Sequence, residues 1–164
     1  MRDKLMAFLY IVITLSVLGW GITLLLEGKD TRIKGVKLSK AIEEQLPKDS
    51  VSIVHFFSSW CVYCRVEFPY IIELKAQSKL PIIGIAYKDT QEQIVPWLDH
   101  MGNPFKEVIY DESAKLAYQM GVTSIPQTFV VNQKGKIIYT QNEAMNQASY
   151  KKLIDFLEGL DGQD

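Results

Sequence analysis

The chain contains two cysteines, Cys61 and Cys64, and only two residues separate them. A pair at this spacing can make and break a disulfide by thiol–disulfide exchange. Residues 51–57 are β-branched and aromatic, as in a buried strand, and apolar residues follow the pair at helical spacing. Cys61 is therefore expected at a helix N-terminus, where unpaired N–H groups and the dipole stabilise a thiolate. We predict that Cys61 is the nucleophile and that Cys64, one turn later, resolves the mixed disulfide.

Two other uses of the cysteine pair are less favoured. A zinc site needs about four ligands. The chain offers two cysteines and two histidines, His55 and His100, with no second pair at ligand spacing. A purely structural disulfide that closes so short a loop constrains the unfolded chain little. Redox chemistry is therefore the preferred interpretation, with no metal and no cofactor.

Length and charge limit the possible classes. A chain of 164 residues suits one domain of ordinary size. The net charge of −1 gives no basic footprint for nucleic acid. Hydrophobic residues make up 48% of the chain, and one N-terminal run holds many of them.

That run, residues 5–26, has 22 residues and no charge. A helix needs about 20 apolar residues to cross a bilayer, whereas the apolar region of a cleaved signal peptide has about 7–15. Leu24-Leu25-Leu26-Glu27 also lacks a small-residue cleavage site. We predict an uncleaved signal anchor at 1–26, a tether and first short helix at 27–50, and a folded domain at 51–160. Flanking charges do not decide the orientation, because long domains translocate largely regardless of charge.

The folded part reads as an α/β domain with a mixed sheet and helices on both faces. A strand, a helix and a second strand within 51–87 predict a parallel βαβ unit. An inserted helix and strand lie within 87–110, and a helix capped by Asp111 follows. Strands at 129–131 and 136–141 predict an antiparallel hairpin. Asn146 is predicted to cap a last helix that ends at Gly159.

The motifs resemble those of a known family. Thioredoxin-like proteins have motifs that resemble two stretches of this chain: residues 60–64, which follow a predicted strand, and residues 125–129, which precede a predicted hairpin. Further motifs narrow the resemblance to the membrane-anchored thiol–disulfide interchange proteins of cytochrome c biogenesis, the DsbE/CcmG group. These motifs are Cys64-Arg65-Val66-Glu67-Phe68-Pro69, Tyr87-Lys88-Asp89, Gly102-Asn103-Pro104-Phe105 and the stretch 121–137. The resemblance covers about 51–157 and the anchor.

The resemblance implies a thioredoxin-like domain on the periplasmic side of a bacterial inner membrane. It implies a reductase that acts on Cys-x-x-Cys disulfides in apocytochrome c or its haem-ligation partners, with electrons from a membrane thiol reductase. It also implies a cis proline at Pro126. That proline would present Ser124 and Ile125 to an extended substrate strand.

Other residues near the cysteines have a functional and an ordinary interpretation. Trp60, with Tyr63, is predicted to shield the thiolate and contact substrate; the alternative for Trp60 is packing at the sheet edge. Glu67 is predicted to accept the Cys64 proton or to tune that thiol. The alternative is a solvated acid in the first helical turn. His55 could relay protons, but a buried and hydrogen-bonded histidine is the preferred interpretation.

Some residues depart from the family pattern. Val62-Tyr63 stand between the cysteines where the family usually has a proline, and Gln127 stands where glutamate is common. TlpA-type reductases, which serve oxidase assembly or metal tolerance, therefore stay an alternative. A copper-delivery protein with Cys61 and Cys64 as soft ligands is another. It is disfavoured because such proteins have three residues between their cysteines and a downstream histidine.

Overall fold

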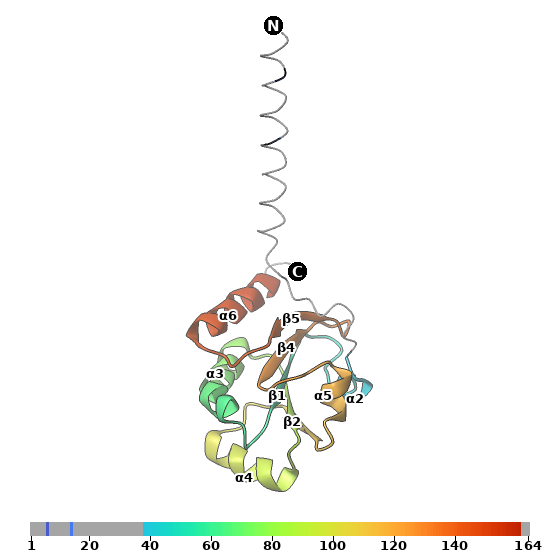
Figure 1. Ribbon diagram of the computed structural model, residues 1–164, viewed down its shortest axis with the longest axis vertical. Coiled ribbons are helices and arrows are strands. Elements are labelled where there is room, and N and C mark those ends of the chain that lie inside the picture. The colour runs from blue at the N-terminus through green and yellow to red at the C-terminus, as the bar shows by residue number, and fades with distance from the viewer. Residues whose placement is uncertain (1–5, 7–13, 15–37, 162–164) are drawn as a thin grey trace. The chain divides into compact units, whose positions relative to one another are not determined.

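The computed structural model describes residues 38–161 together with Met6 and Thr14 (Figure 1). The chain forms two units, Met1–Lys34 and Gly35–Asp164, and the elements named below belong to the second. In chain order they are α2 (Lys40–Glu43), β1 (Ser52–Phe57), α3 (Val62–Ser78), β2 (Ile82–Tyr87), α4 (Gln91–Met101), β3 (Glu107–Asp111), α5 (Lys115–Gln119), β4 (Gln127–Val131), β5 (Ile137–Gln141) and α6 (Gln147–Asp161).

The five strands form one mixed sheet in the order β3-β2-β1-β4-β5. β2 runs parallel to both β1 and β3, while β4 runs antiparallel to both β1 and β5. Parallel neighbours require crossover connections, which α3 and α4 provide, whereas antiparallel neighbours can be joined by a short turn. The predicted parallel βαβ unit, the inserted helix and strand, and the C-terminal hairpin are all confirmed.

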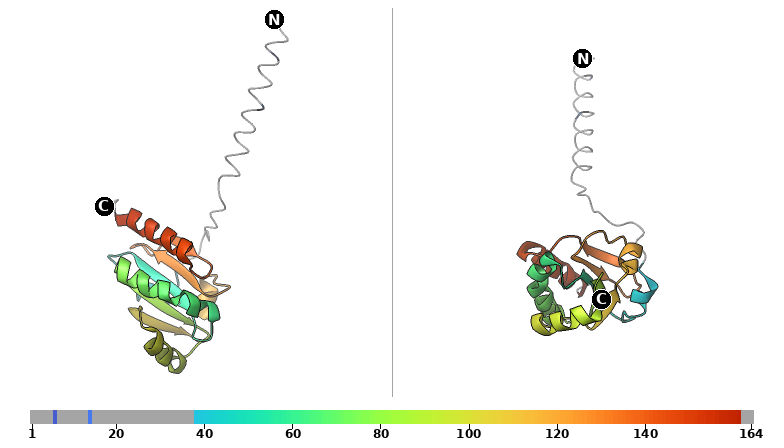
Figure 2. Two further views of the ribbon diagram at one scale, coloured as in Figure 1. Left: turned by 90° about the vertical axis from the view of Figure 1, so that its left-hand side faces the viewer. Right: turned by 60° about the horizontal axis from the view of Figure 1, so that its bottom comes forward.

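Helices cover both faces of this sheet. Figure 2 shows α3, α4 and α6 on one face, and Figure 1 shows α2 and α5 on the other. All six residues of β1 are buried, and their side chains alternate between the two layers. Ile53 and Phe57 pack in the core under α3, while Val54 and Phe56 pack in the core beneath α5. His55 lies between Ile53 and Phe57 and therefore points toward α3.

The last helix is longer than the sequence suggested. Asn146 caps it as predicted, because its Oδ1 accepts hydrogen bonds from the N–H groups of Ala148 and Ser149. The predicted end at Gly159 is wrong, since α6 continues to Asp161. Gly159 does not adopt the positive φ of a glycine that ends a helix.

The apolar residues of α3 do not all face the sheet. Ile71 and Leu74 are buried, whereas Val66 is 65% exposed. The buried face of α3 includes Cys64 and Phe68. Val66 lies two residues from each of them, about 200° around the helix, and so points outward.

The predicted anchor at 5–26, apart from Met6 and Thr14, and much of the tether lie outside the described residues. Among the residues that the structure does describe, no helix is long and apolar enough to cross a membrane.

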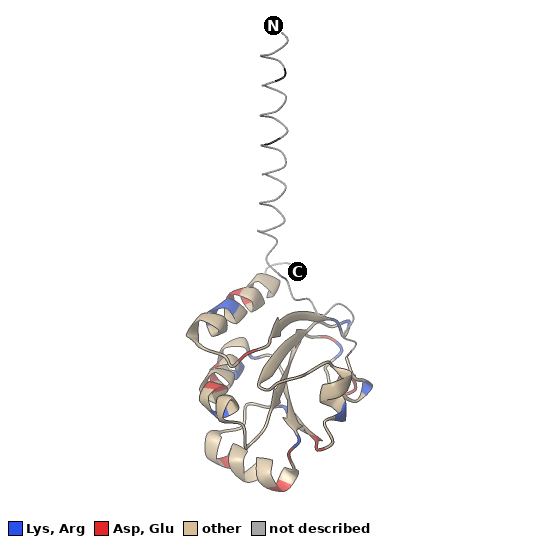
Figure 3. Ribbon diagram, viewed as in Figure 1, with Lys and Arg blue, Asp and Glu red and all other residues tan. Residues whose placement is uncertain are grey.

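Charged residues of both signs are spread over the elements of the domain (Figure 3). Both α3 and α6 carry basic and acidic residues. This mixture agrees with the near-neutral composition of the whole chain.

Candidate active site

Cys61 and Cys64 form a disulfide at the start of α3. Cys61 is the N-cap residue, and its Sγ accepts a hydrogen bond from the Cys64 N–H at 3.1 Å. A sulfur in this place pairs with one of the N–H groups that a helix start leaves free, so a thiolate there is stabilised. Cys61 keeps 7% of its surface exposed and Cys64 keeps none. Cys61 is therefore the sulfur that a substrate reaches first.

The loop before β4 faces this sulfur. The Ile125–Pro126 peptide bond is cis, as the family resemblance implied. The carbonyl oxygen of Ile125 lies 4.0 Å from Cys61 Sγ. Ser124 is exposed and Ile125 half-buried, so this backbone is open to an approaching chain beside the disulfide.

Trp60 and Tyr63 lie close to Cys61 in the chain and form an exposed aromatic rim. Trp60 is 55% exposed and Tyr63 is 69% exposed. The indole of Trp60 packs against the Tyr87 ring, and its Nε1 donates to the carbonyl oxygen of Lys88 at 3.3 Å. Tyr63 follows one position after Val62, which is 72% exposed. Sequence reasoning missed Val62; with Val66 it forms an outward i, i+4 apolar pair that spacing alone could have indicated.

Asp89 holds the loop that leads into Cys61, a role that residue type and spacing did not indicate. The side chain is buried, and its Oδ2 accepts from both the N–H and the hydroxyl of Ser59 at 2.7 Å. Its Oδ1 accepts from the Thr90 N–H at 2.9 Å. These bonds tie the start of α3 to the loop after β2, and they hold Trp60 and Cys61 in place.

Glu67 lies inside the domain, one turn beyond Cys64. It is 1% exposed, and its Oε2 accepts a hydrogen bond from the Met145 N–H. Burial raises the pKa of Glu67 to about 7, while the bond from Met145 acts in the opposite direction. The alternative of a solvated acid in the first helical turn is therefore wrong. A carboxyl that titrates near neutral pH beside a thiol is suited to general acid–base work.

His55 lies at the centre of the sheet, fully buried. Its Nδ1 is 2.9 Å from Thr128 Oγ1, and its Nε2 is 3.4 Å from Glu67 Oε1. Burial lowers the pKa of His55 to about 3, so the imidazole is neutral at neutral pH. The preferred prediction of a buried, hydrogen-bonded histidine is confirmed, whereas its approach to Glu67 was not predicted.

The arrangement therefore has an accessible sulfur, a buried sulfur and a buried carboxyl along one helix. Within the described part of the chain, no group of three or more histidines, cysteines or acids could hold a metal ion. The two histidines considered for zinc differ in setting, since His55 is buried and His100 is exposed on α4.

Comparison with known families agrees with this geometry. The model of the Redoxin family matches residues 36–154. The chain belongs to the Redoxin family. Among solved structures, a putative thiol:disulfide interchange protein DsbE from Chlorobium tepidum shares the fold with this redoxin domain. The TM-score is 0.61 at 20% identity, over 73% of this chain and 86% of that chain. A secreted Mycobacterium tuberculosis disulfide oxidoreductase gives a TM-score of 0.59 at 17% identity. The match covers 71% of this chain and 85% of that chain.

Curated relatives of the redoxin domain share more of its sequence. The thiol:disulfide interchange protein HelX of Rhodobacter capsulatus is 38% identical over 96 residues, which are 58% of this chain and 54% of HelX. The probable thiol:disulfide interchange protein DsbE-2 of Pasteurella multocida is 33% identical over 100 residues, 61% and 52% of the two chains. The chain thus spans about half the length of the curated relatives it matches. The resemblance to the DsbE/CcmG group is confirmed.

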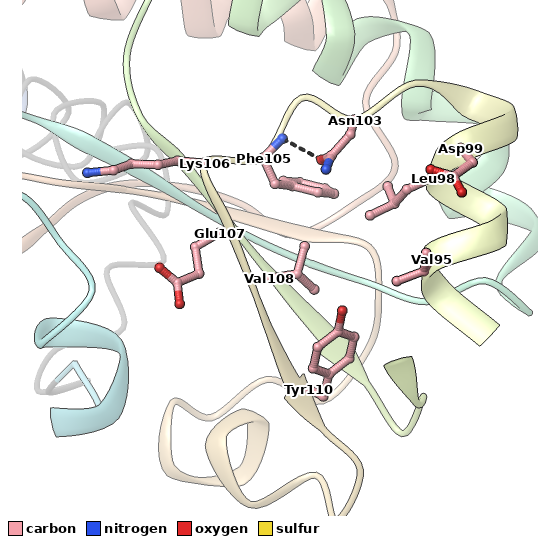
Figure 4. A pocket seen from close by; sticks show the side chains of 9 residues that line it. All are labelled: Val95, Leu98, Asp99, Asn103, Phe105, Lys106, Glu107, Val108 and Tyr110. Carbon is pink, nitrogen blue, oxygen red and sulfur yellow. Dashed lines mark hydrogen bonds between the residues drawn. The ribbon is translucent and has the colours of Figure 1, made fainter. Parts of the chain in front are cut away.

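The inserted segment of the redoxin domain, 87–110, contributes to both core and surface. Its residues Leu98 and Phe105 are buried in the core. Between α4 and β3 it also forms a cavity of about 260 Å³, drawn in Figure 4. The lining residues are Val95, Leu98, Asp99, Asn103, Phe105, Lys106, Glu107, Val108 and Tyr110, and none of them is a predicted site residue. The first part of the insert contacts the loop that carries Cys61, through Tyr87, Lys88 and Asp89.

Proposed function

We propose that this chain is a membrane-anchored thiol–disulfide oxidoreductase that reduces disulfides in apocytochrome c or in its haem-ligation partners. One observation carries the proposal: the Cys61–Cys64 pair begins α3 directly beside the cis Ile125–Pro126 loop. The names of the relatives, thiol:disulfide interchange proteins, support the same reaction. The catalytic domain is proposed to face the periplasm of a bacterium, with residues 5–26 as its anchor in the inner membrane.

The reaction has two exchange steps. The Cys61 thiolate attacks one sulfur of a substrate disulfide; a mixed disulfide forms, and the other substrate sulfur leaves as a thiolate. Cys64 then attacks Cys61 Sγ, which forms the Cys61–Cys64 disulfide and releases the second substrate thiolate. Two electrons pass from the protein to the substrate. A membrane thiol reductase is proposed to return them by the same exchange in reverse.

Proton transfer accompanies the second step. Cys64 is fully buried, so its thiol must lose a proton before it attacks, without help from bulk water. Glu67 is the proposed acceptor, because it lies one turn further on the same buried face of α3. With a pKa raised to about 7, its carboxyl can take up this proton and release it again near neutral pH.

The substrate is proposed to bind as an extended strand. The open backbone at Ser124 and Ile125 can pair with it by β-augmentation. Trp60 and Tyr63 give the strand an apolar contact on the other side of Cys61, and exposed aromatic groups are common at the centre of such interfaces.

Trapping of mixed disulfides tests this proposal. A Cys64→Ala variant of the full chain cannot resolve the intermediate and should accumulate partners bound through Cys61, to be identified by mass spectrometry. Cys61→Ala is the matched control and should retain none of them. Capture of apocytochromes or haem-ligation proteins supports the proposal. Capture of oxidase-assembly or metal-tolerance proteins instead would favour the TlpA-type alternative, and no Cys61-dependent capture contradicts both.

A rate comparison tests selectivity. The rim and the first part of the insert shape the surface beside Cys61, so the full chain should reduce an oxidised Cys-x-x-Cys-His peptide faster than insulin. Equal rates, or faster reduction of insulin, would leave a general reductase in which the insert only enlarges the core.

A further inference from the structure

The buried contact between His55 and Glu67 joins two titratable side chains of which the proposed cycle uses only one. Glu67 Oε2 is occupied by the Met145 N–H, and His55 Nδ1 by the Thr128 hydroxyl. The remaining two atoms, Glu67 Oε1 and His55 Nε2, lie 3.4 Å apart. Neither has another hydrogen-bond partner among the described residues. Among the described residues, a hydrogen bond between Glu67 Oε1 and His55 Nε2 would therefore satisfy both atoms.

Within the described residues, the groups that contact the pair through hydrogen bonds and ring stacking are uncharged. Gly84 on β2 and Thr128 on β4 flank His55 in the sheet, and the rings of Phe57 and Phe105 stack on the imidazole. On the side of α3, Cys64 is the titratable neighbour of Glu67, one turn away. From the segment before α6, the pair receives only the backbone N–H of Met145.

The Thr128 hydroxyl can donate or accept, so its hydrogen bond is compatible with both tautomers of His55, and the protonation state of Glu67 decides between them. If Nδ1 carries the proton, it donates to Thr128 Oγ1, and the lone pair of Nε2 faces Glu67 Oε1. An ionised Glu67 would then put a carboxylate oxygen against a lone pair in a buried site, which is unfavourable. A protonated Glu67 instead donates its O–H to Nε2, and both buried atoms are satisfied.

We propose that His55 is a positioning residue that stabilises the protonated form of Glu67 in the oxidised protein, by accepting the Glu67 proton at Nε2 while Thr128 fixes the imidazole. This role rests on the proposed thiol–disulfide exchange. Glu67 is ionised in the reduced protein and takes the proton that leaves Cys64 when the second exchange step begins. It returns that proton to Cys64 when the disulfide is reduced. No proton is gained or lost by the imidazole in either direction.

Burial already raises the pKa of Glu67 to about 7. An acceptor for the neutral carboxyl acts in the same direction, because a hydrogen bond to the neutral form disfavours the charged form. His55 itself stays neutral at neutral pH, since burial lowers its pKa to about 3.

Two substitutions of His55 separate its two hydrogen bonds. An asparagine side chain can place an amide near the position of Nδ1 and so keep the Thr128 partner, but it is too short to reach Glu67. A glutamine side chain can place an amide near the position of Nε2 and so keep a partner for Glu67. In His55→Asn the pKa of Glu67 should fall by about one unit or more, because the acceptor is lost and water can enter. In His55→Gln it should fall less.

The titration of Glu67 can be followed by NMR of the full chain in detergent, with glutamate labelled at the carboxyl carbon and Glu67→Gln to assign the signal. The pH profile of the second exchange step, measured with a small disulfide, should shift in the same direction and by a similar amount. If an asparagine at position 55 prevents folding, Thr128→Val provides the test. It leaves the imidazole in place, frees Nδ1 and allows Nε2 to carry the proton, so the pKa of Glu67 should again fall.

An unchanged pKa of Glu67 in His55→Asn and Thr128→Val would overturn the proposal. A raised pKa would overturn it as well, because Nε2 would then be the donor to an ionised Glu67. A lowered pKa with an unmoved exchange profile would show that the pair is structural only. All three results are independent of which protein is trapped by Cys64→Ala, so failure of this inference and failure of the proposed function can be told apart.

Discussion

The two sulfurs of the disulfide lie in very different surroundings. Around Cys61 the neighbours are exposed or half-buried: the indole of Trp60, the ring of Tyr63 and the backbone of Ile125. Cys64 instead faces the interior, where Glu67 and His55 are buried. The outer side has exposed aromatic side chains and a backbone that can form hydrogen bonds with another chain. The inner side has two buried titratable side chains, Glu67 and His55.

This difference suggests a division of labour along one turn of α3. We propose that partner recognition belongs to the outer side, which can change without disturbing the core. Proton handling is proposed to belong to the inner side, where low polarity shifts pKa values. Substitutions on the inner side should therefore change stability and pH dependence, and substitutions on the outer side should change exchange with substrate.

The largest effect is expected from Glu67→Gln on the inner side. Because the folded-state pKa of Glu67 is raised from 4.5 to about 7, its contribution to stability is fully present below pH 4.5 and is lost as the pH rises through about 7. Glutamine stays neutral and can still accept from Met145. The unfolding free energy of the oxidised variant, relative to the parent, should rise by about 3 kcal/mol from below pH 4.5 to above pH 7.

Urea unfolding of both proteins across that pH range measures this difference. The titration of His55 is common to both proteins, so it largely cancels. Parallel profiles for variant and parent would contradict a buried carboxyl that titrates near neutral pH.

The next effect is expected at Gly84, beside His55. A Cβ there would lie 2.9 Å from atoms of the Phe105 and Phe57 rings, and rigid rings in a packed core cannot move aside easily. Gly84→Ala should cost about 2 kcal/mol of unfolding free energy. Gly159→Ala is the matched control. It lies in α6 with open space around it, so alanine should stabilise the helix by about 0.5–1 kcal/mol. A neutral or stabilising Gly84→Ala would show that the inner side is loosely packed.

The smallest effect is expected on the outer side. Trp60→Ala should lower kcat/KM for a protein disulfide about tenfold, as for an aromatic residue at an interface centre. It should change the unfolding free energy by no more than about 0.5 kcal/mol, since the indole is mostly exposed. Tyr118→Ala is the control, because Tyr118 is 86% exposed on α5, over the opposite face of the sheet. Equal losses of kcat/KM in Trp60→Ala and Tyr118→Ala would show that Trp60 has no specific part in substrate recognition.

Local sequence signals predicted much of this structure. The strand before Cys61, the helix after it, the hairpin and the Asn146 cap all depend on residues a few positions apart, and all are present. The end of α6 was wrong because a glycine near a helix end is only a preference, and Leu160 and Asp161 continue the helix. The apolar spacing along α3 did not reveal which face meets the sheet, and Val66 lies on the outward face.

The inner side could not be predicted in full, because its contacts join distant parts of the chain. Met145 lies 78 residues from Glu67, and Asp89 lies 30 residues from Ser59. Residue type and spacing indicated that Glu67 shares a helical face with Cys64. They could not indicate that β1 would place His55 next to Glu67. They also could not indicate that the Glu67 carboxyl would be buried away from solvent.

Alkylation of the reduced chain tests most directly the claim that the two sulfurs have different roles. At neutral pH, a short pulse of iodoacetamide followed by mass spectrometry should show Cys61 modified at least about tenfold faster than Cys64, because Cys61 is accessible and its thiolate is stabilised by the helix start. In denaturant the two rates should converge. Equal rates in the folded protein, or faster modification of Cys64, would contradict the assignment of Cys61 as nucleophile and Cys64 as resolving thiol.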